Sequence, residues 1–227
     1  MANENKTLRN IKKAIQITSE QDQLIVGSCL GDLHIQHRQN KHSRVHRLRF
    51  AHSPDQTQLV DWKYSRLRSL CVETKPPYRE EKKGTYNFYT SWLPQLTFYH
   101  SLFYEQTPKG NWVKRVPQNI KEHLTSPLSL AVFFMDDGTH RDHRACRLCT
   151  QSFSAQDHDR LIECLRDNFG ILAKKESYYS KQRKRTYCNL VILSDSYDRF
   201  MECVAETIRK QVPQMAYRLA PRKNSLT

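Results

Sequence analysis

Two apolar segments that each end in an aspartate, 105 residues apart, constrain this chain more than any other feature. The first runs from Leu24 to Asp32 and the second from Leu128 to Asp137. The pattern that follows each segment recurs in the same order, so each half is predicted to be an α-β-β-α-β-β-α unit. Two such units in one chain predict pseudo-twofold symmetry, the single-chain equivalent of a homodimer.

The pattern in the first half shows how the elements are assigned. Residues 44–50 alternate as in a strand with one buried face, which places His46, Leu48 and Phe50 together. Ser53 and Pro54 predict a helix start, because serine caps helices and proline is favoured at the first helical position. The remaining predictions are a helix through residue 70, a hairpin over 78–90, a helix over 94–104, a strand over 144–153, a helix after residue 154, a hairpin over 171–193 and a helix over 197–208.

These elements predict an α+β fold with two pseudo-symmetric halves, each a small sheet with helices on one face. A stretch containing Pro108, Gly110 and Pro117 is expected to link the halves. The expected divisions are a basic N-terminal arm at 1–20, the first half at 21–104, a linker at 105–126, the second half at 127–220 and a C-terminal tail at 221–227.

Glycines in the first apolar helix predict close packing against the second. Gly27 and Gly31 are four residues apart, and a glycine inside a helix costs about 0.5–1 kcal/mol relative to alanine. Close approach of another helix along that edge would compensate for this cost. Ala131 is the small residue expected to meet that edge from the second helix.

The aspartates at the helix ends point to a cation. An anion at a helix C-terminus faces the negative end of the helix dipole, at a cost of about 0.3–1 kcal/mol. Two such ends side by side would repel each other more strongly. Carboxylates and helix-terminal carbonyls are hard oxygen ligands that suit Mg²⁺, and carboxylates holding metal against a phosphodiester suggest hydrolysis by an activated water. The alternative is a pair of ordinary buried helices with capping or surface aspartates.

Composition favours a polyanionic partner and a folded chain. Thirty-seven Lys and Arg against 23 Asp and Glu give a formal net charge of +14 over 227 residues. The hydrophobic content of 38% argues against general disorder. No apolar run approaches the roughly 20 residues that span a bilayer, and no secretory pattern opens the chain, so no membrane partner is expected. The seven cysteines are expected to be reduced and mostly buried in an intracellular protein.

Residues 25–33 and 130–138 resemble the paired nine-residue motifs of LAGLIDADG homing endonucleases, specifically the single-chain, intron-encoded branch. The second segment, with Met135-Asp136-Asp137-Gly138, is the closer match. Stretches 114–117, 150–153 and 212–219 also resemble that branch. The resemblance covers roughly residues 20–220, and it implies two concave DNA-binding sheets packed through the two motif helices.

The resemblance also implies the active site. Asp32 and Asp137 would be catalytic metal ligands, completed by the carbonyls of Gly31 and Asp136. Lys114 and Arg218 match the basic positions near the scissile phosphates. Arginine stays protonated, so it can brace a phosphate but cannot readily act as a base, and generic phosphate positioning is the alternative for Arg218.

The activity implied is a metal-dependent double-strand cut in a long DNA target, leaving short 3′ overhangs and promoting mobility of the host intron. The implied cofactor is Mg²⁺, with Mn²⁺ as a substitute and Ca²⁺ binding without supporting cleavage. A monomer is expected, located in an organelle or in a prokaryotic cytoplasm. The alternatives are an intron RNA maturase or an inactive DNA-binding protein on the same fold. Neither a maturase nor an inactive DNA-binding protein requires both Asp32 and Asp137, so the presence of both favours the nuclease.

Basic and amide side chains on the predicted hairpins are candidates for contact with DNA, because Arg can bond guanine and Asn or Gln can bond adenine in the major groove. For each one, contact with phosphate or plain solvation is the alternative. The candidates are Arg38, Arg47, Arg49, Arg147, Gln151, Arg185, Tyr187 and Asn189.

A second basic set is expected to contact the DNA backbone rather than base edges. It falls in the second predicted hairpin and its turn, and consists of Lys174, Lys175, Lys181, Arg183 and Lys184.

A competing metal motif is His140-x2-His143-x2-Cys146-x2-Cys149, which could bind zinc. Structural zinc sites usually join two ligand pairs across a longer loop, and a strand here would turn the ligands to different sides. The alternative places Cys146 in the core and leaves His143 facing DNA.

Overall fold

The computed structural model describes residues 2–40, 43–141 and 144–220. The first half has the predicted order and contains α2 (Ser19–Leu30), β1 (His34–Asn40), β2 (Ser43–His52), α3 (Thr57–Arg66), β3 (Tyr78–Glu80), β4 (Thr85–Tyr89) and α4 (Thr97–Phe103). The second half repeats it with α6 (Pro127–Asp137), β7 (Gly138–His140), β8 (Cys146–Leu148), α7 (Ala155–Phe169), β9 (Ala173–Ser180), β10 (Arg185–Ile192) and α8 (Tyr197–Gln211).

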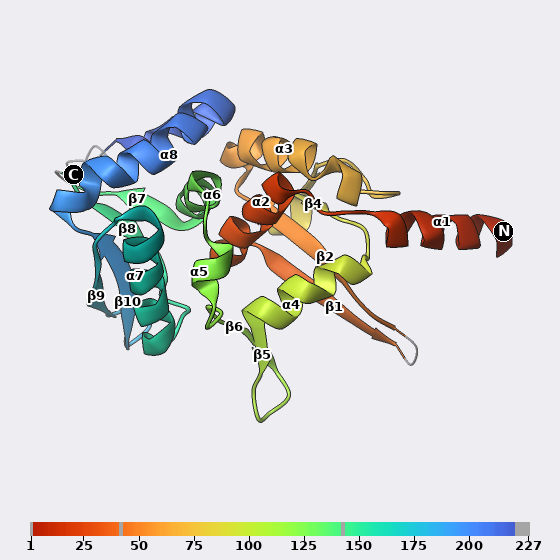
Figure 1. Ribbon diagram of the computed structural model, residues 1–227, viewed down its shortest axis with the longest axis horizontal. Helices are drawn as coiled ribbons and strands as arrows, with labels where there is room; N and C mark the ends of the chain where they lie inside the picture. The colour runs from red at the N-terminus through yellow and green to blue at the C-terminus, as the bar shows by residue number, and fades with distance from the viewer. Residues whose placement is uncertain (1, 41–42, 142–143, 221–227) are drawn as a thin grey trace.

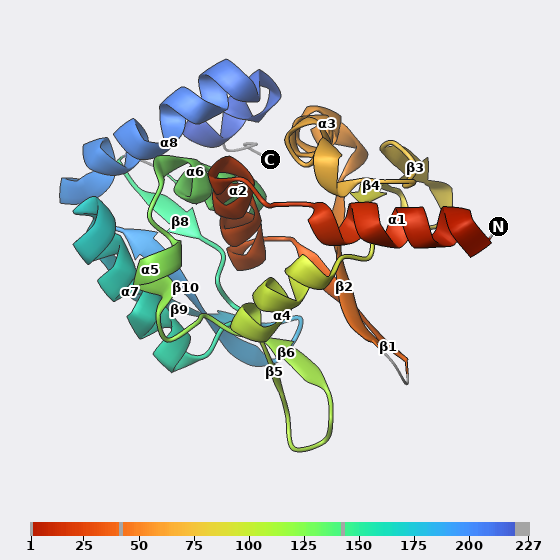
Figure 2. The same cartoon turned by 45° about the vertical axis from the view of Figure 1, so that its right-hand side comes forward.

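Each half builds a four-stranded antiparallel sheet, and the two sheets have equivalent topologies. The strand orders are β1-β2-β4-β3 and β7-β8-β10-β9. The motif helices α2 and α6 lie side by side between the sheets, as both views show (Figures 1 and 2). The predicted α+β fold with pseudo-symmetric halves is therefore confirmed.

Local signals fix the ends of the motif helices. Thr18 caps α2 through a reciprocal pair of hydrogen bonds with Gln21, the capping box that satisfies two exposed amides. Ser126 caps α6 and accepts from the amide of Leu128, and Pro127 takes the first helical position. These caps define the residue at which each motif helix begins.

The packing of α2 against α6 is as close as the glycines predict. A Cβ added to Gly27 would lie 2.2 Å from the carbonyl oxygen of Ser129, and one added to Gly31 would lie 2.5 Å from the Cβ of Asp136. The nearest atoms thus belong to Ser129 and Asp136, whereas the sequence suggested Ala131. Ala131 is fully buried in the same helix.

The elements outside the two units are an N-terminal helix and the connection between the halves. α1 (Ala2–Ala14) forms the N-terminal arm, and residues 105–126 include most of a hairpin, β5 (Tyr104–Gln106) with β6 (Trp112–Lys114), and the short α5 (Ile120–His123). The connection between the halves is therefore structured. Short 3₁₀ turns occupy Pro54–Gln56, Arg68–Leu70, Glu81–Lys83, Pro94–Leu96, Ser194–Ser196 and Pro213–Leu219.

Two predicted elements are shorter than expected. The helix expected to reach Leu70 ends at Arg66 and continues as a 3₁₀ turn. The strand expected over 144–153 is regular only over Cys146–Leu148, because the chain turns after Cys149 to bring Phe153 into the core. None of the seven cysteines forms a disulfide, and five are buried. In the described ranges no helix is both long enough and apolar enough for a bilayer.

Candidate active site

The ends of α2 and α6 bring together the two aspartates that the sequence singled out. Asp32 follows the end of α2, and its amide donates to the carboxylate of Asp136 across 3.4 Å. Burial and the nearby charges of Asp32 and Asp136 together raise the pKa of Asp137 to about 7. Burial and Asp136 also raise the pKa of Asp32. The site therefore concentrates negative charge that the protein only partly neutralises.

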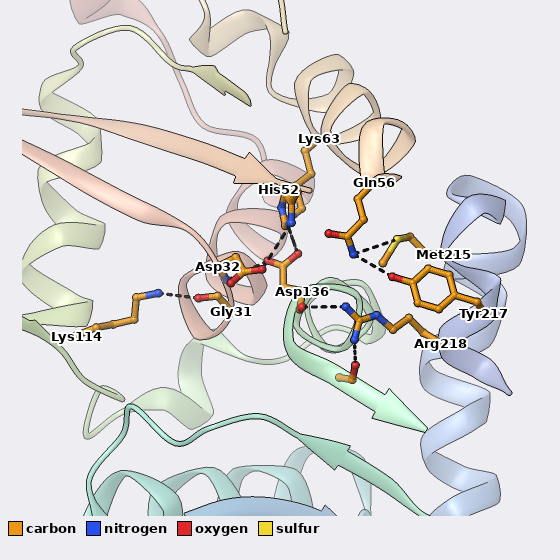
Figure 3. A network of polar contacts seen from close by, with 11 residues as sticks. Gly31, Asp32, His52, Gln56, Lys63, Lys114, Asp136, Met215, Tyr217 and Arg218 are labelled. Carbon is orange, nitrogen blue, oxygen red and sulfur yellow. Dashed lines mark hydrogen bonds and ion pairs between the residues drawn. The ribbon is translucent and has the colours of Figure 1, made fainter. Parts of the chain in front are cut away.

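The two halves present matched carbonyls beside these carboxylates. Lys114 donates through Nζ to the carbonyl of Gly31 across 2.7 Å. Arg218 donates to the carbonyl of Asp136 across 3.4 Å and also to that of Gly138. Figure 3 shows both basic side chains reaching these carbonyls. Each predicted basic residue thus bonds to the residue that directly precedes a candidate catalytic aspartate.

Asp136 has a second role that the sequence did not indicate. Its carboxylate lies fully buried, 2.5 Å from Nζ of Lys63, which is also fully buried. His52 lies 3.8 Å from Asp136 and 3.6 Å from Asp32 (Figure 3). Burial lowers the pKa of His52 to about 3, so its imidazole is neutral at physiological pH.

Lys63 and His52 are therefore site residues that sequence analysis missed, although each carried a signal. Lys63 is four residues from both Leu59 and Leu67, on the buried stripe of a helix, where an unpaired lysine is rare. His52 continues the inward alternation of residues 46, 48 and 50. An ionisable residue at such a position indicates a buried polar partner, but the pattern does not identify that partner.

The position of Arg218 depends on contacts between the halves. Arg218 lies in the 3₁₀ turn Pro213–Leu219, which docks on the start of α3. Gln56 donates to the hydroxyl of Tyr217 across 3.0 Å (Figure 3). The amide of Gln58 donates to the side chain of Gln214 across 2.9 Å. These contacts hold the turn Pro213–Leu219 of the second half against the first half, with Arg218 at the end of α6.

The donor set at the helix ends fits a hard divalent cation. Asp32 and Asp137 supply carboxylates, and Gly31 and Asp136 supply backbone carbonyls. All four donors are oxygens, the ligands that Mg²⁺ prefers. The raised pKa values of the Asp32 and Asp137 carboxyls indicate negative charge that a cation would neutralise. The side chain of Asp136 is committed to Lys63, so only its carbonyl suits this role.

On the first sheet, the predicted arginines form an aromatic-backed surface. Arg47 bonds Gln36 across 2.6 Å and lies over Tyr89 and Trp92 at 4.3 and 4.7 Å. Arg38 is exposed and also lies near Trp92. The third predicted arginine, Arg49, donates to the hydroxyl of Tyr89 and forms an ion pair with Glu80. The neighbouring rings hold the guanidinium groups of Arg38 and Arg47 in position on this surface.

On the second sheet, the basic turn is exposed as predicted, but two residues are placed differently. Lys181, Arg183, Lys184 and Arg185 are exposed in and beside the β9–β10 turn, Lys174 and Gln151 are exposed, and Arg185 lies over the ring of Tyr187. Asn189, predicted to face outward, is buried, and its side chain accepts from the amide of Thr150.

Lys175 is the other exception, since it faces the helices. It forms a 2.7 Å ion pair with Asp159 of α7, whereas Lys174 lies on the opposite face because neighbours in a strand alternate. Arg147 pairs with Glu176, an acid on the open face that sequence analysis did not consider. The predicted pair of adjacent lysines therefore contributes only one side chain to the open face.

The zinc alternative is not supported by its two best-placed residues. Both ring nitrogens of His140 are hydrogen-bonded, Nδ1 to the carbonyl of Arg141 and Nε2 to the hydroxyl of Tyr197. Cys146 is fully buried, as the core alternative predicted. His143 lies outside the described residues.

Comparison with known proteins agrees with this geometry. A model of the LAGLIDADG DNA endonuclease family matches residues 22–200. The chain is 32% identical to DNA endonuclease I-ChuI of Chlamydomonas applanata over 173 residues, which cover 69% of this chain and 76% of that protein. It is 25% identical to protein RecA of Mycolicibacterium chitae, over 91% of this chain and 48% of that protein.

Further likenesses concern a maturase and solved structures. The chain is 24% identical to the cytochrome b mRNA maturase bI2 of Saccharomyces cerevisiae, over 86% of this chain and 46% of that protein. The homing endonuclease I-WcaI bound to its DNA recognition sequence shares the fold with a TM-score of 0.74 at 19% identity, over 94% of this chain and 92% of that one. Variants of the homing endonuclease I-DmoI match with a TM-score of 0.54 at 12% identity, over 84% of this chain and 98% of that one.

Proposed function

This chain belongs to the LAGLIDADG DNA endonuclease family, and we propose that it is a homing endonuclease that makes a divalent-metal-dependent double-strand break in a long DNA target. The proposed products carry short 3′ overhangs, and the proposed consequence is mobility of a host intron. The proposed enzyme acts as a monomer, because one chain already contains both halves of the site.

One observation carries the proposal. Two aspartates from opposite halves meet at the ends of packed helices, and each is preceded by a carbonyl that a basic side chain contacts. The arrangement is repeated by the pseudo-twofold relation, as a cut in each of two antiparallel strands requires. A binding protein would have no need for a repeated pair of carboxylates with raised pKa values.

The proposed ligands of the cation are Asp32, Asp137 and the carbonyls of Gly31 and Asp136. The bound ion would supply charge neutralisation at the phosphate and a more acidic water. Mg²⁺ is the proposed ion. The I-DmoI complex solved with target DNA in 2 mM Mn supports a divalent ion in this fold, and we propose that Mn²⁺ substitutes here.

Lys114 and Arg218 have complementary proposed roles. Each donates to a carbonyl beside a catalytic carboxylate, which fixes its charged group next to the path of a phosphate. Burial lowers the pKa of Lys114, so this amine can exchange a proton more readily than an exposed lysine. The guanidinium of Arg218 would stabilise developing negative charge instead. The two strands would therefore be cut at unequal rates.

The proposed DNA surface consists of the open faces of the two sheets and the exposed β9–β10 turn. Arg47 and Arg38, backed by Trp92, are proposed to reach base edges in the major groove. Lys181, Arg183 and Lys184 are proposed to contact phosphates. The net charge of +14 and the I-WcaI complex with its recognition sequence support this assignment.

The proposal is tested by selecting a target from a random DNA library with Mg²⁺ and then measuring cleavage of a plasmid that carries it. Asp32→Asn and Asp137→Asn should each abolish double-strand cleavage and retain DNA affinity. Asp195→Asn, which changes an exposed acid in a surface turn, is the matched control and should cut at the wild-type rate. Linearisation at the wild-type rate by either active-site variant would refute the assignment.

A second candidate function is suggested by the likeness to the mRNA maturase. We propose it as an additional activity on host intron RNA, supported by the basic surface rather than by the carboxylates. Splicing of the host intron with purified protein tests it, since Asp32→Asn would abolish DNA cleavage and leave maturation intact. Failure of splicing with active nuclease would remove only this second candidate.

A further inference from the structure

Three histidines gather on the helix side of the first sheet, at a place that the active site does not use. His37 on β1 and His46 on β2 face each other in the strand register, and His37 Nδ1 lies 2.9 Å from His46 Nε2. His100 of α4 stacks on both rings, with centroids 4.2 Å from His46 and 5.5 Å from His37. His46 and His100 are buried.

The spacing of these rings suits a metal ion. Each histidine offers a ring nitrogen, and these three atoms lie within 4.8 Å of one another. With Zn–N bonds of about 2.0–2.1 Å, two nitrogens on one tetrahedral zinc lie about 3.3 Å apart. Small side-chain rotations therefore bring the three nitrogens onto one ion. Among the described residues, this is the one group of three or more His, Cys, Asp and Glu side chains with such spacing.

We propose that His37, His46 and His100 bind a divalent cation of the zinc class, with water as the fourth ligand. Imidazole suits Zn²⁺, Co²⁺, Ni²⁺ and Cu²⁺, whereas the all-oxygen active site suits Mg²⁺. The two sites therefore select different ions. The site does not depend on the proposed nuclease function.

The surroundings favour a metal site over a purely aromatic stack. His46 Nδ1 lies 3.0 Å from Thr97 Oγ1, a contact that orients the ring and directs Nε2 toward His37. Nonpolar rings would serve a stack equally well without burying imidazole nitrogens.

Two aromatic rings border the cluster on the linker side. The Trp112 ring of β6 lies edge-on to His100 at 4.6 Å, and the Tyr104 ring stacks on His100 at 4.9 Å. A bound ion would join β1, β2 and α4, which Figure 1 shows beside one another near the β5–β6 hairpin. Its role would be structural, because it would fix the end of the β1–β2 ribbon that carries Arg38 and Arg47.

Cobalt titration of the full-length protein tests the proposal. The Asp32→Asn/Asp137→Asn background removes the active-site carboxylates as competitors. One equivalent of Co²⁺ should bind and give visible d–d bands without thiolate charge-transfer absorption, and Zn²⁺ should displace it and raise the Tm. His100→Phe, which keeps the ring stack, and His37→Gln, which changes a partly exposed ligand, should both lose this binding. His123→Gln on α5 is the control and should retain it.

Three results would overturn the proposal. They are the absence of stoichiometric Co²⁺ binding by the folded background protein, unchanged binding by both His100→Phe and His37→Gln, and a thiolate charge-transfer band, which would assign the ion to cysteines. Circular dichroism of each variant establishes that loss of binding is not loss of fold. Because the readout is metal binding, failure here leaves the nuclease proposal unaffected.

Discussion

Nζ of Lys63 lies 2.5 Å from Oδ1 of Asp136, and both side chains are fully buried. This pair joins α3 to the end of α6, at the residue that directly precedes Asp137. The carboxylate occupies space that exists because the equivalent position in α2 is Gly31. The two motif helices are therefore not equivalent, since one contributes a glycine and the other a buried charge.

Removing one member of this pair should be costly. Lys63→Met leaves the Asp136 carboxylate buried without its main partner, and breaking such a pair typically costs about 3–5 kcal/mol. The midpoint of urea unfolding measures this loss. The Lys63→Met/Asp136→Asn double variant should recover most of it, because no uncompensated charge remains. Equal midpoints for Lys63→Met and the wild type would contradict a buried ion pair.

Adding a single methyl group between the motif helices should also destabilise the protein. In Gly27→Ala the new Cβ would meet the Ser129 backbone carbonyl, which no side-chain rotation can relieve. Overpacking of this kind costs about 1–3 kcal/mol, more than the gain in helix propensity of about 0.5–1 kcal/mol. Cleavage should fall with it, because the helices set the spacing of Asp32 and Asp137.

The neighbouring residue provides the control for that substitution. Ser28 is fully buried on the same helix, and its hydroxyl has no hydrogen-bond partner among the described residues. Ser28→Ala should therefore be neutral or slightly stabilising. Thermal melts of both variants distinguish a steric effect at Gly27 from general sensitivity of α2.

The stability of the metal-free protein should depend on Asp137 and on pH. Its pKa is raised from 3.8 to about 7 in the folded state, so folding favours the protonated acid. This contribution is fully present below the unfolded value and is lost as the pH rises through 7. Asp137→Asn should therefore unfold at higher urea concentration than the wild type at pH 8 in EDTA, with a difference that shrinks toward pH 4.

The expected difference in unfolding free energy between Asp137→Asn and the wild type depends on the pKa shift of Asp137 and on the solvent exposure of its carboxyl. One pKa unit corresponds to about 1.4 kcal/mol, and solvent screening at a partly exposed carboxyl reduces the expected gain to about 1–2 kcal/mol. The same substitution should abolish cleavage, so one change would separate stability from activity. If Asp137→Asn were less stable than the wild type at pH 8, ionised Asp137 would not destabilise the folded state, and the prediction would be wrong.

The parts that sequence predicted well depend on local rules. Periodicity in the apolar helices, the alternation ending in Phe50 and the cap at Ser53 each act over a few residues, and the repeat then orders the whole fold. Asp32 and Asp137 could be placed together because the repeat puts them at equivalent helix ends. The close approach at Gly27 followed from the energetic cost of glycine in a helix.

The parts that sequence did not predict depend on contacts between distant segments. Lys63 and Asp136 are 73 residues apart, and Gln56 and Tyr217 are 161 apart. Asn189 is polar and lies in a strand, yet it is buried. Its side-chain oxygen accepts a hydrogen bond from the buried backbone amide of Thr150, a contact that the local sequence does not reveal. The pairing of Lys175 with Asp159 likewise follows from strand alternation, which the run of basic residues obscured.

The difference between Lys184 and Lys175 allows a paired test of the DNA surface. Lys184 is exposed in the β9–β10 turn, whereas Lys175 pairs with α7 on the other side of the sheet. Each phosphate contact contributes about 0.9 to the slope of log affinity against log salt. Lys184→Ala should therefore lower the magnitude of that slope by about 0.9, and Lys175→Ala should leave it unchanged. Fluorescence anisotropy at a series of salt concentrations measures both slopes. Since the two substitutions remove the same charge, an equal decrease in both would mean that net charge, rather than a defined surface, governs binding.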